Sequence, residues 1–251
     1  MKLYNLKVET ELSGKGFFAI DLIDLDKDFA EFENMYIKQH NPYYVSCKVY
    51  IHELDKIHLL ESNGFQFIEN QLKLKKTIKK HNTIVDSLPY SYKKVTSVDN
   101  LALVKSIAKN TFVADRFSND KYLDSSLSGL RYMRFVEDSF NKKDENLYAL
   151  FNTITDEVVA FGSHKIVSDK EALILLGGVK NDLKSAGIGA IHDYFALNEL
   201  FALGIKKVFT HISMRNKPVL HLQVNKLGYS IADSYLIFRK VYGNKTHNKH
   251  L

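Results

Sequence analysis

Two segments of this chain, far apart in the sequence, repeat one local pattern. One copy runs from residue 43 to 76 and the other from 207 to 240. Each has a strand-like run, a helical stretch, a single glycine (Gly64 or Gly228) and an alternating run that ends in basic residues. A glycine after a helical pattern is typical of a helix C-cap, and alternation is typical of a strand. The repeat therefore predicts a strand, helix, glycine, strand unit that occurs twice.

The segment between the two copies, residues 77–91, is polar and lysine-rich and ends in Leu88 and Pro89. Such a composition is typical of a linker. A chain of 251 residues with 45% hydrophobic side chains can form one or two folded domains. We therefore expect two domains, 1–85 and 86–251.

The second half of the chain alternates strand and helix patterns. Turn-forming residues separate three strand-like runs, which predicts an antiparallel meander. Asp99 is a candidate N-cap for the first helix. In order, we expect a strand at 92–97, helices at 100–111 and 127–141, and strands at 147–152, 158–167 and 172–179.

Cysteine content and hydropathy exclude several classes of protein. Cys47 is the only cysteine, so the chain can form neither an internal disulfide nor a thiolate metal cluster, and we expect Cys47 in the core and no metal. The chain has no apolar run long enough for a membrane-spanning helix, and residues 1–11 lack a signal-peptide core. We therefore expect a soluble cytoplasmic protein that does not bind membranes.

The formal net charge of +6 favours an anionic partner. Much of the excess lies in residues 73–80 and in the last dozen residues, which is typical of a solvated strand end, linker or tail. The aromatic residues do not form a basic-aromatic stripe, so we do not expect nucleic-acid binding. A phosphorylated small molecule stays open as a ligand.

A glycine-rich loop follows the strand expected at 172–179. The chain passes through 180–185 into residues 186–190, Ala-Gly-Ile-Gly-Ala, where we expect a helix to begin. Glycines let backbone N–H groups approach phosphate oxygens, and the positive end of a helix attracts the same charge. Neither the Rossmann nor the Walker phosphate pattern occurs here. The loop therefore predicts a diphosphate site of another kind.

This loop resembles the acetyl-CoA signature of the GNAT superfamily of N-acetyltransferases, Val-x-Pro-x-x-(Gln/Arg)-x-x-Gly-x-(Gly/Ala). The match runs from Val179 to Gly189. It departs from the signature at Asn181, Lys184 and Ala186, which stand in place of proline, Gln/Arg and a basic residue. A second GNAT signature, an Asn followed by Gly-Phe, is similar to Asn216 with Gly228 and Tyr229.

The resemblance implies an α/β (α+β) fold with a mixed central sheet flanked by helices. It also implies acetyl-CoA as co-substrate, with its pantetheine arm along the strand before the loop, where that strand splays from its neighbour. The residues implied in cofactor binding are Leu176, Gly177, Gly178, Val179, Lys184, Ser185, Ala186, Gly187, Ile188, Gly189, Ala190 and Asn216.

Most of the chain is similar to two-domain sugar-nucleotide N-acetyltransferases of the TDP-fucosamine acetyltransferase type. The resemblance rests on 17–18, 45–50, 60–65, 68–69, 115–120 and 130–139. It implies that 1–85 is a degenerate, truncated GNAT-like domain, that 86–251 is the catalytic domain, and that the acceptor is the amine of a nucleotide-linked amino-deoxy sugar.

The same resemblance implies a set of acceptor contacts. Arg116 would face a nucleotide diphosphate, beside Phe117, while Asp120 or Tyr132 would bind a sugar hydroxyl or amine. An ordinary loop between helices, with one aromatic residue in the core, is the alternative that the sequence leaves open.

Direct acetyl transfer needs a neutral amine, an N–H group for the oxyanion, expected near Val179, and an acid for the departing thiolate. The family places a tyrosine as that acid, but the corresponding positions hold Gln223 and Val224. The interval from Asn to Gly is one residue longer than in the family signature, so we expect a re-registered helix. Tyr235 is our first substitute for the acid and His211 our second, while Glu171 or ordered water would be the base.

Two other functions stay open from the sequence. The missing tyrosine and the altered loop are compatible with a catalytically silent module that binds CoA or a nucleotide. An N-acetyltransferase that acts on a peptide N-terminus or another small amine is the second alternative. We also allow for a homodimer.

Overall fold

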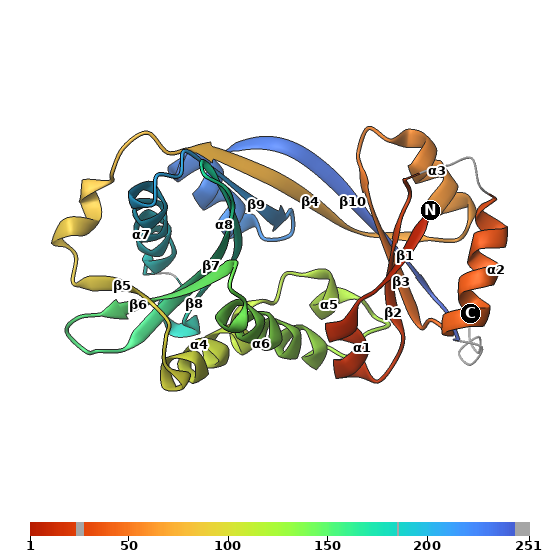
Figure 1. Ribbon diagram of the computed structural model, residues 1–251, viewed down its shortest axis with the longest axis horizontal. Helices are drawn as coiled ribbons and strands as arrows, with labels where there is room; N and C mark the ends of the chain where they lie inside the picture. Colours follow the sequence, from red (N-terminus) through yellow and green to blue (C-terminus); the bar gives the residue numbers. More distant parts are fainter. Residues whose placement is uncertain (24–27, 185, 244–251) are drawn as a thin grey trace.

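The computed structural model describes residues 1–23, 28–184 and 186–243. Within these ranges the chain forms one mixed ten-stranded sheet in the order β1-β2-β3-β10-β4-β9-β8-β7-β6-β5 (Figure 1). The strands are β1 Lys2–Asn5, β2 Phe17–Asp21, β3 Tyr44–Tyr50, β4 Gln66–Thr77, β5 Tyr90–Lys94, β6 Glu145–Asn152, β7 Val158–Ser168, β8 Glu171–Val179, β9 Lys207–Ser213 and β10 Ser230–Val241.

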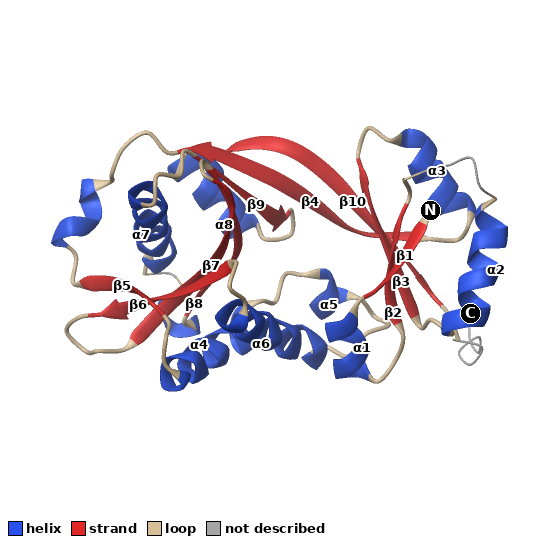
Figure 2. Ribbon diagram, viewed as in Figure 1, coloured by secondary structure: helices blue, strands red, loops and turns tan. Residues whose placement is uncertain are grey.

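Helices cover both faces of this sheet, and the long strands β4 and β10 run between the two halves of the molecule (Figure 2). The helices and helical turns are α1 Lys7–Ser13, α2 Phe29–His40, α3 Leu54–Ser62, η1 Thr83–Ser87, α4 Val98–Thr111, α5 Arg116–Asn119, α6 Ser126–Asn141, η2 Asn181–Leu183, α7 Ile188–Ala202, α8 Lys217–His221 and the π-helical turn η3 Leu222–Lys226.

The predicted repeat is confirmed, and its two copies exchange their last strands. The first copy is β3, α3, Gly64 and β4, and the second is β9, α8 with η3, Gly228 and β10. Strand β4 pairs with β9 of the other copy, and β10 pairs with β3. The middle of the sheet is therefore β3-β10-β4-β9, with antiparallel neighbours throughout.

Because of this exchange, each half of the molecule completes the hydrophobic core of the other. Phe238 of β10 is 2% exposed and packs with Val45 and Cys47 of β3. Leu74 of β4 is fully buried in a second core with Leu200 of α7. Burial of one such side chain contributes roughly 1.5–3 kcal/mol. The expectation that Cys47 is a core residue is thereby met, and burial raises the pKa of its thiol to about 12.

The elements expected in the second half are found with shifted ends. The meander is confirmed as β6, β7 and β8, which pair antiparallel in chain order. Helix α4 begins at Val98, two residues earlier than expected, because Ser97 caps it by accepting a hydrogen bond from the Asn100 N–H at 3.2 Å. The prediction of Asp99 as N-cap is wrong, since Asp99 lies inside the first turn.

Strand alternation divides the helices between the two sheet faces in the second half. On β6, Leu147 and Ala149 pack in a cluster with side chains of α4 and α6. Leu150, on the opposite face, packs in a cluster with Ile188 of α7. Helices α4 and α6 therefore cover one face and α7 covers the other, as Figure 1 shows.

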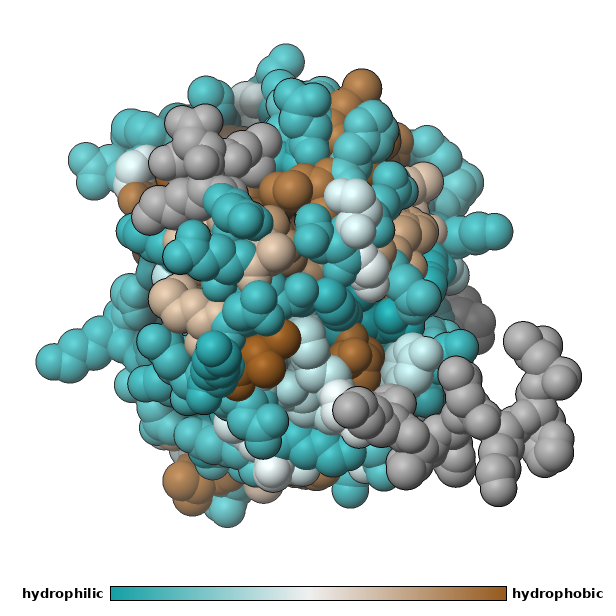
Figure 3. Space-filling view, turned by 90° about the vertical axis from the view of Figure 1, so that its right-hand side faces the viewer, coloured by the Kyte–Doolittle hydropathy of each residue, from teal (hydrophilic) through white to brown (hydrophobic). Residues whose placement is uncertain are grey.

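The end of the molecule that carries α2 and α3 is mainly hydrophilic on the face seen in Figure 3. Its brown, apolar residues lie in small separate groups outside the grey atoms. Scattered apolar residues of this kind are ordinary on protein surfaces. Within the described ranges, no helix is both long and apolar enough to cross a membrane.

Candidate active site

Strands β8 and β9 separate halfway along their length. Their parallel ladder ends at the pair Ile174 and Thr210. Beyond it, β8 continues to Val179 alongside β7, and β9 continues to Ser213 alongside β4. The pairing of β8 with β7 shifts register between Ser163 and His164, which is typical of a β-bulge that bends a strand. Within the described ranges, residues 176–179 of β8 therefore have no strand partner on the β9 side.

The loop after β8 leads into α7 through a glycine with a left-handed backbone. Gly187 has φ 77°, and a Cβ at this position would have no described atom within 4 Å. The N–H groups of Gly187, Ile188 and Gly189 find no acceptor among the described residues. In the next residue, the Ala190 N–H donates to Gly187 O at 3.0 Å. Three successive amides at the positive end of a 15-residue helix thus lack an acceptor within the described part of the chain.

Side chains that depart from the GNAT signature hold this loop against α4. Asn181 Nδ2 donates to Asn110 O at 3.1 Å, and Lys184 Nζ donates to Thr111 O at 3.2 Å. Thr111 Oγ1 in turn donates to Val179 O at 3.1 Å. The last carbonyls of a helix lack partners within it, so these donors satisfy them and fix the loop. Asn181 and Lys184 therefore position the loop from outside.

The two motifs found in the sequence meet at the first turn of α7. A methyl group at Gly189 would lie 3.6 Å from Leu222 Cδ2 and 3.8 Å from Val179 Cγ2. Leu222 begins η3, directly after α8. Asn216 caps α8, because its Oδ1 accepts a hydrogen bond from the Val219 N–H at 3.4 Å. Ser185, which the sequence also implied in cofactor binding, lies outside the described residues.

The remaining residues that the sequence implied in cofactor binding differ in their exposure and in their contacts. A Cβ at Gly178 would lie 2.5 Å from the ring of Phe161, which is completely buried, so packing alone requires glycine there. Gly177 is exposed, Leu176 packs at the edge of the cluster under α4, and the exposed Ala186 donates its N–H to Leu183 O at 3.1 Å.

The expected re-registration of the helix takes the form of a π-helical turn. Residues Leu222–Lys226 form η3, and the Leu227 N–H donates to Leu222 O at 3.0 Å, five residues back. A π turn accommodates one extra residue within a helix and often lies at a functional site. Gln223, at a position where the family has tyrosine, is 6% exposed, and its Oε1 has no partner among the described residues.

Both predicted catalytic side chains lie on one polar face of the exchanged strands. His211 is the first β9 residue beyond the ladder with β8. Its ring centroid lies 5.8 Å from that of Tyr235 on β10. Lys48 of β3 places its Nζ 4.0 Å from the Tyr235 ring centroid and donates to Gln71 Oε1 at 2.7 Å. Lys73 of β4 is paired with His211 in register.

The environment sets the charges of this face. Burial, together with Lys48 and Lys73, lowers the pKa of His211 to about 4, so the imidazole is neutral near pH 7. Burial, with Arg116 as the next cause, lowers the pKa of Lys48 to about 8. Burial raises the pKa of Tyr235 above its ordinary value, so its hydroxyl stays protonated. The face therefore offers a neutral imidazole beside a protonated phenol.

The residues implied in acceptor binding surround α5, which faces the exchanged strands. Arg116 Nη1 lies 3.0 Å from Glu69 Oε2 of β4, in an ion pair whose side chains are 19% and 2% exposed. Asp120 Oδ2 accepts hydrogen bonds from Arg239 Nε at 2.9 Å and from the Tyr44 hydroxyl at 3.2 Å. Two buried ion pairs thus bind α5 and its C-cap to β4 and β10.

The two aromatic members of that set differ in exposure. Phe117 is 1% exposed in the core cluster under α5, and the guanidinium carbons of Arg116 and Arg131 lie 4.8 Å and 4.2 Å from its ring centroid. Tyr132 is partly exposed and stacks on Phe112 with 3.8 Å between ring centroids. The Phe117 side chain is therefore surrounded mainly by protein atoms, whereas part of the Tyr132 side chain is exposed to solvent.

Sequence reasoning missed the contribution of the first half of the chain to this face. Lys48 and Glu69 come from β3 and β4 and lie beside side chains of the second half. The polar positions Ser46, Lys48 and Tyr50 alternate with buried Val45, Cys47 and Val49, which signals a polar face opposite a core. Only the strand exchange places that face beside His211 and Tyr235.

No protein-family model and no curated protein sequence matches this chain. Solved structures resemble it instead. A tandem GNAT protein from the clavulanic acid biosynthesis pathway aligns with TM-score 0.63 and 13% identity over 90% of this chain and 75% of that one. A GCN5-related N-acetyltransferase from Sphaerobacter thermophilus aligns with TM-score 0.64 and 10% identity over 96% and 75%.

A conserved protein of unknown function from Staphylococcus epidermidis ATCC 12228 aligns with TM-score 0.63 and 14% identity over 90% of this chain and 84% of that one. At such identities the likeness shows the fold. The fold is that of the GCN5-related N-acetyltransferases, and the expected mixed central sheet flanked by helices is confirmed.

Proposed function

We propose that this protein transfers an acetyl group from acetyl-CoA to a primary amine. The observation that carries the proposal is the row of N–H groups at 187–189 that have no acceptor among the described residues, beside the separation of β8 from β9. Open amides at a helix N-terminus suit a diphosphate. The free edge of 176–179 suits the amide groups of a pantetheine arm, and Asn216 lies in the adjoining helix cap.

Tyr235 and His211 take complementary roles in the proposed reaction. The amine nitrogen attacks the thioester carbonyl carbon, and the carbon–sulfur bond breaks. The protonated Tyr235 gives a proton to the departing thiolate, and ordered water removes the proton that the nitrogen loses, with the neutral His211 imidazole as a hydrogen-bond acceptor beside it. Glu171 does not fit the role of base, because it lies at the other end of β8 and is 3.8 Å from Lys207 Nζ.

The acceptor in this proposal carries an anionic group, as a nucleotide-linked amino sugar does. Support comes from the charge of the polar face, where Lys48 and Lys73 lie near His211. Arg116, Phe117, Asp120 and Tyr132 stay predicted acceptor contacts. The sugar-nucleotide class and the two-domain subtype rest on the sequence resemblance.

A catalytically silent CoA-binding module is the second candidate. Gln223 at the position of the usual tyrosine favours it. The test is release of free thiol from acetyl-CoA in the presence of nucleotide-linked amino sugars and, separately, of small amines. Tyr235→Phe should lower kcat by a factor of about 10² or more with little change in KM. The matched control is Tyr4→Phe, which removes an exposed hydroxyl from β1 and should leave kcat unchanged.

Two results would contradict this assignment. Tyr235→Phe with a wild-type kcat would remove Tyr235 as the acid. Binding of acetyl-CoA without thiol release for any amine in the panel would favour the silent module.

A further inference from the structure

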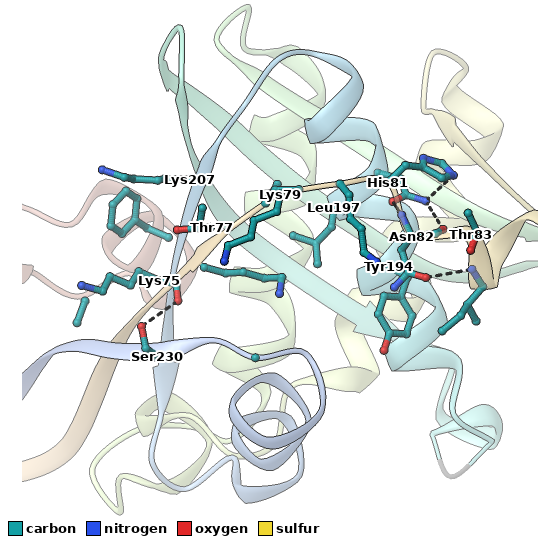
Figure 4. Close-up of a pocket in the computed structure, with 18 residues that line it drawn as sticks. Lys75, Thr77, Lys79, His81, Asn82, Thr83, Tyr194, Leu197, Lys207 and Ser230 are labelled. Atoms are coloured by element: carbon teal, nitrogen blue, oxygen red, sulfur yellow. Dashed lines mark hydrogen bonds between the residues drawn. The ribbon is translucent and has the colours of Figure 1, made fainter.

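A second candidate site lies away from the acetyl-CoA loop, where β4, β9 and β10 meet the segment 78–84 and α7. A cavity of about 1000 Å³ opens there, and five lysine side chains line it (Figure 4). They are Lys75, Lys76, Lys79, Lys80 and Lys207. The sequence predicted a solvated strand end and linker for the run 73–80. The fold instead gathers most of that run around one cavity and adds Lys207 from β9.

The positive charge of this cavity is poorly compensated within the protein. Its described lining contains neither aspartate nor glutamate. Lys207 has Glu171 at 3.8 Å, a long contact, and Lys76 Nζ donates to the Leu227 carbonyl oxygen. Lys75, Lys79 and Lys80 have no ion pair among the described residues. Like charges held together repel one another, and a bound anion would relieve that repulsion.

The wall that carries Lys79 and Lys80 is held in place by a buried side chain of α7. Asn198 is 8% exposed. Its Oδ1 accepts a hydrogen bond from the Asn82 N–H at 2.8 Å, and its Nδ2 donates to Asn82 O at 3.0 Å. Figure 4 draws the hydrogen bonds around His81 and Asn82 as dashed lines. The segment is thus pinned to α7, which prepares the lysines for a ligand.

Apolar side chains complete the cavity. Tyr194 and Leu197 of α7 and Phe209 of β9 belong to its lining. A cavity of this size exceeds what phosphate groups alone would fill, and it lies at the upper end of the range for small-molecule sites. Lysines recognise phosphate charge, and aromatic rings pack against a flat base. We propose that this cavity binds a multiply phosphorylated nucleotide.

This site is separate from the proposed acetyl-CoA site. The cavity shares no lining residue with 175–190 or with Asn216. Helix α7 begins at Ile188 beside the loop, and Leu197 lies roughly 13 Å further along its axis. The two ligands can therefore bind together, and the inference does not depend on the proposed acetyl transfer.

The test is calorimetry with ATP on the full chain, at about 0.15 M salt and with saturating acetyl-CoA present. The double variant Lys79→Glu/Lys80→Glu should raise the Kd for ATP about tenfold or more, because it reverses two charges at the site. The matched control Lys7→Glu/Lys143→Glu makes the same change in net charge on exposed residues elsewhere and should leave the Kd within about twofold.

Inorganic tripolyphosphate, which has no base, shows how much of the affinity for ATP comes from the phosphates and how much from the base. It should compete with ATP, and Tyr194→Ala should weaken ATP binding while leaving tripolyphosphate binding unchanged. The proposal is overturned if wild-type protein gives no ATP binding, if both double variants weaken ATP equally, or if acetyl-CoA displaces ATP. If Tyr194→Ala weakens neither ligand, the site takes polyphosphate, and the nucleotide assignment fails.

Discussion

The two halves of this molecule contain equivalent helices whose N-termini differ in one respect. In the first half, β2 and β3 run parallel and α2 connects them; in the second half, β8, α7 and β9 repeat that arrangement. The N-terminus of α2 is closed by Asp28, whose carboxylate accepts a hydrogen bond from the Ala30 N–H at 2.8 Å. The N-terminus of α7 is open, because its N-cap is Gly187.

This difference is what the proposal predicts if the α7 end of the fold unit binds a ligand and the α2 end has a structural role. A carboxylate at a helix N-terminus satisfies the free amides and repels phosphate. A glycine leaves both the amides and the positive end of the helix available. The second copy also has the π-helical turn η3, whereas α3 of the first copy is a nine-residue α-helix without one. Ligand chemistry is therefore expected at α7, while α2 stabilises the shared sheet.

The largest expected effect comes from separating the halves. A chain of residues 86–251 lacks β3 and β4, so β10 loses its partner on both sides and Phe238 loses its core. We expect no cooperative urea transition by circular dichroism for this fragment. Co-expression with residues 1–85 restores the missing strands and should restore the transition. A fragment 86–251 that unfolds cooperatively alone, with the stability of the full chain, would contradict the mutual dependence of the two halves.

A smaller loss is expected from the ion pair that joins α5 to β4. Arg116→Met leaves the Glu69 carboxylate buried without its partner, which should lower the free energy of unfolding by about 3–5 kcal/mol. Urea denaturation measures this loss. The double variant Arg116→Met/Glu69→Met removes both charges and should recover most of the stability. If the single variant loses less than about 1 kcal/mol, the pair does not hold α5 in place.

The smallest expected effect concerns the cap of α2. Asp28→Ala removes the side-chain cap and should cost about 1 kcal/mol of stability in urea denaturation. Affinity for acetyl-CoA should not change, because α2 lies in the other half of the sheet (Figure 1). A loss of acetyl-CoA affinity in this variant would contradict the proposal that the N-terminus of α2 is structural and that only the N-terminus of α7 binds the ligand.

Local sequence patterns were enough to predict the repeated unit, the meander and the glycine loop, because each depends on nearby residues. The exchange of β4 and β10 was not predictable. The alternation in 66–77 indicates a strand and its buried face, but it does not determine which strand pairs with it. The Asp99 prediction failed because Ser97, two residues earlier, supplies an equivalent capping oxygen.

The candidate site shows the same limit. The loop at 187–189 could be recognised from the sequence because its two glycines lie directly at the start of the helix whose N-terminus they form. The polar face needs Lys48, Tyr235 and His211 from three strands, and the lysine cavity needs Lys207 beside a run more than a hundred residues earlier. Groups of residues drawn from several strands come together only through the order of the strands in the sheet. That order cannot be predicted from any single segment of the chain.

The central claim, that the open amides of α7 bind a diphosphate, is tested most directly by calorimetry with acetyl-CoA on two matched variants. Gly187→Glu and Gly14→Glu both place a carboxylate at a glycine with positive φ (77° and 66°), where a Cβ meets no described atom within 4 Å, so they share backbone strain and charge. We predict that Gly187→Glu abolishes acetyl-CoA binding and that Gly14→Glu retains it. Wild-type affinity in both variants would contradict the assignment.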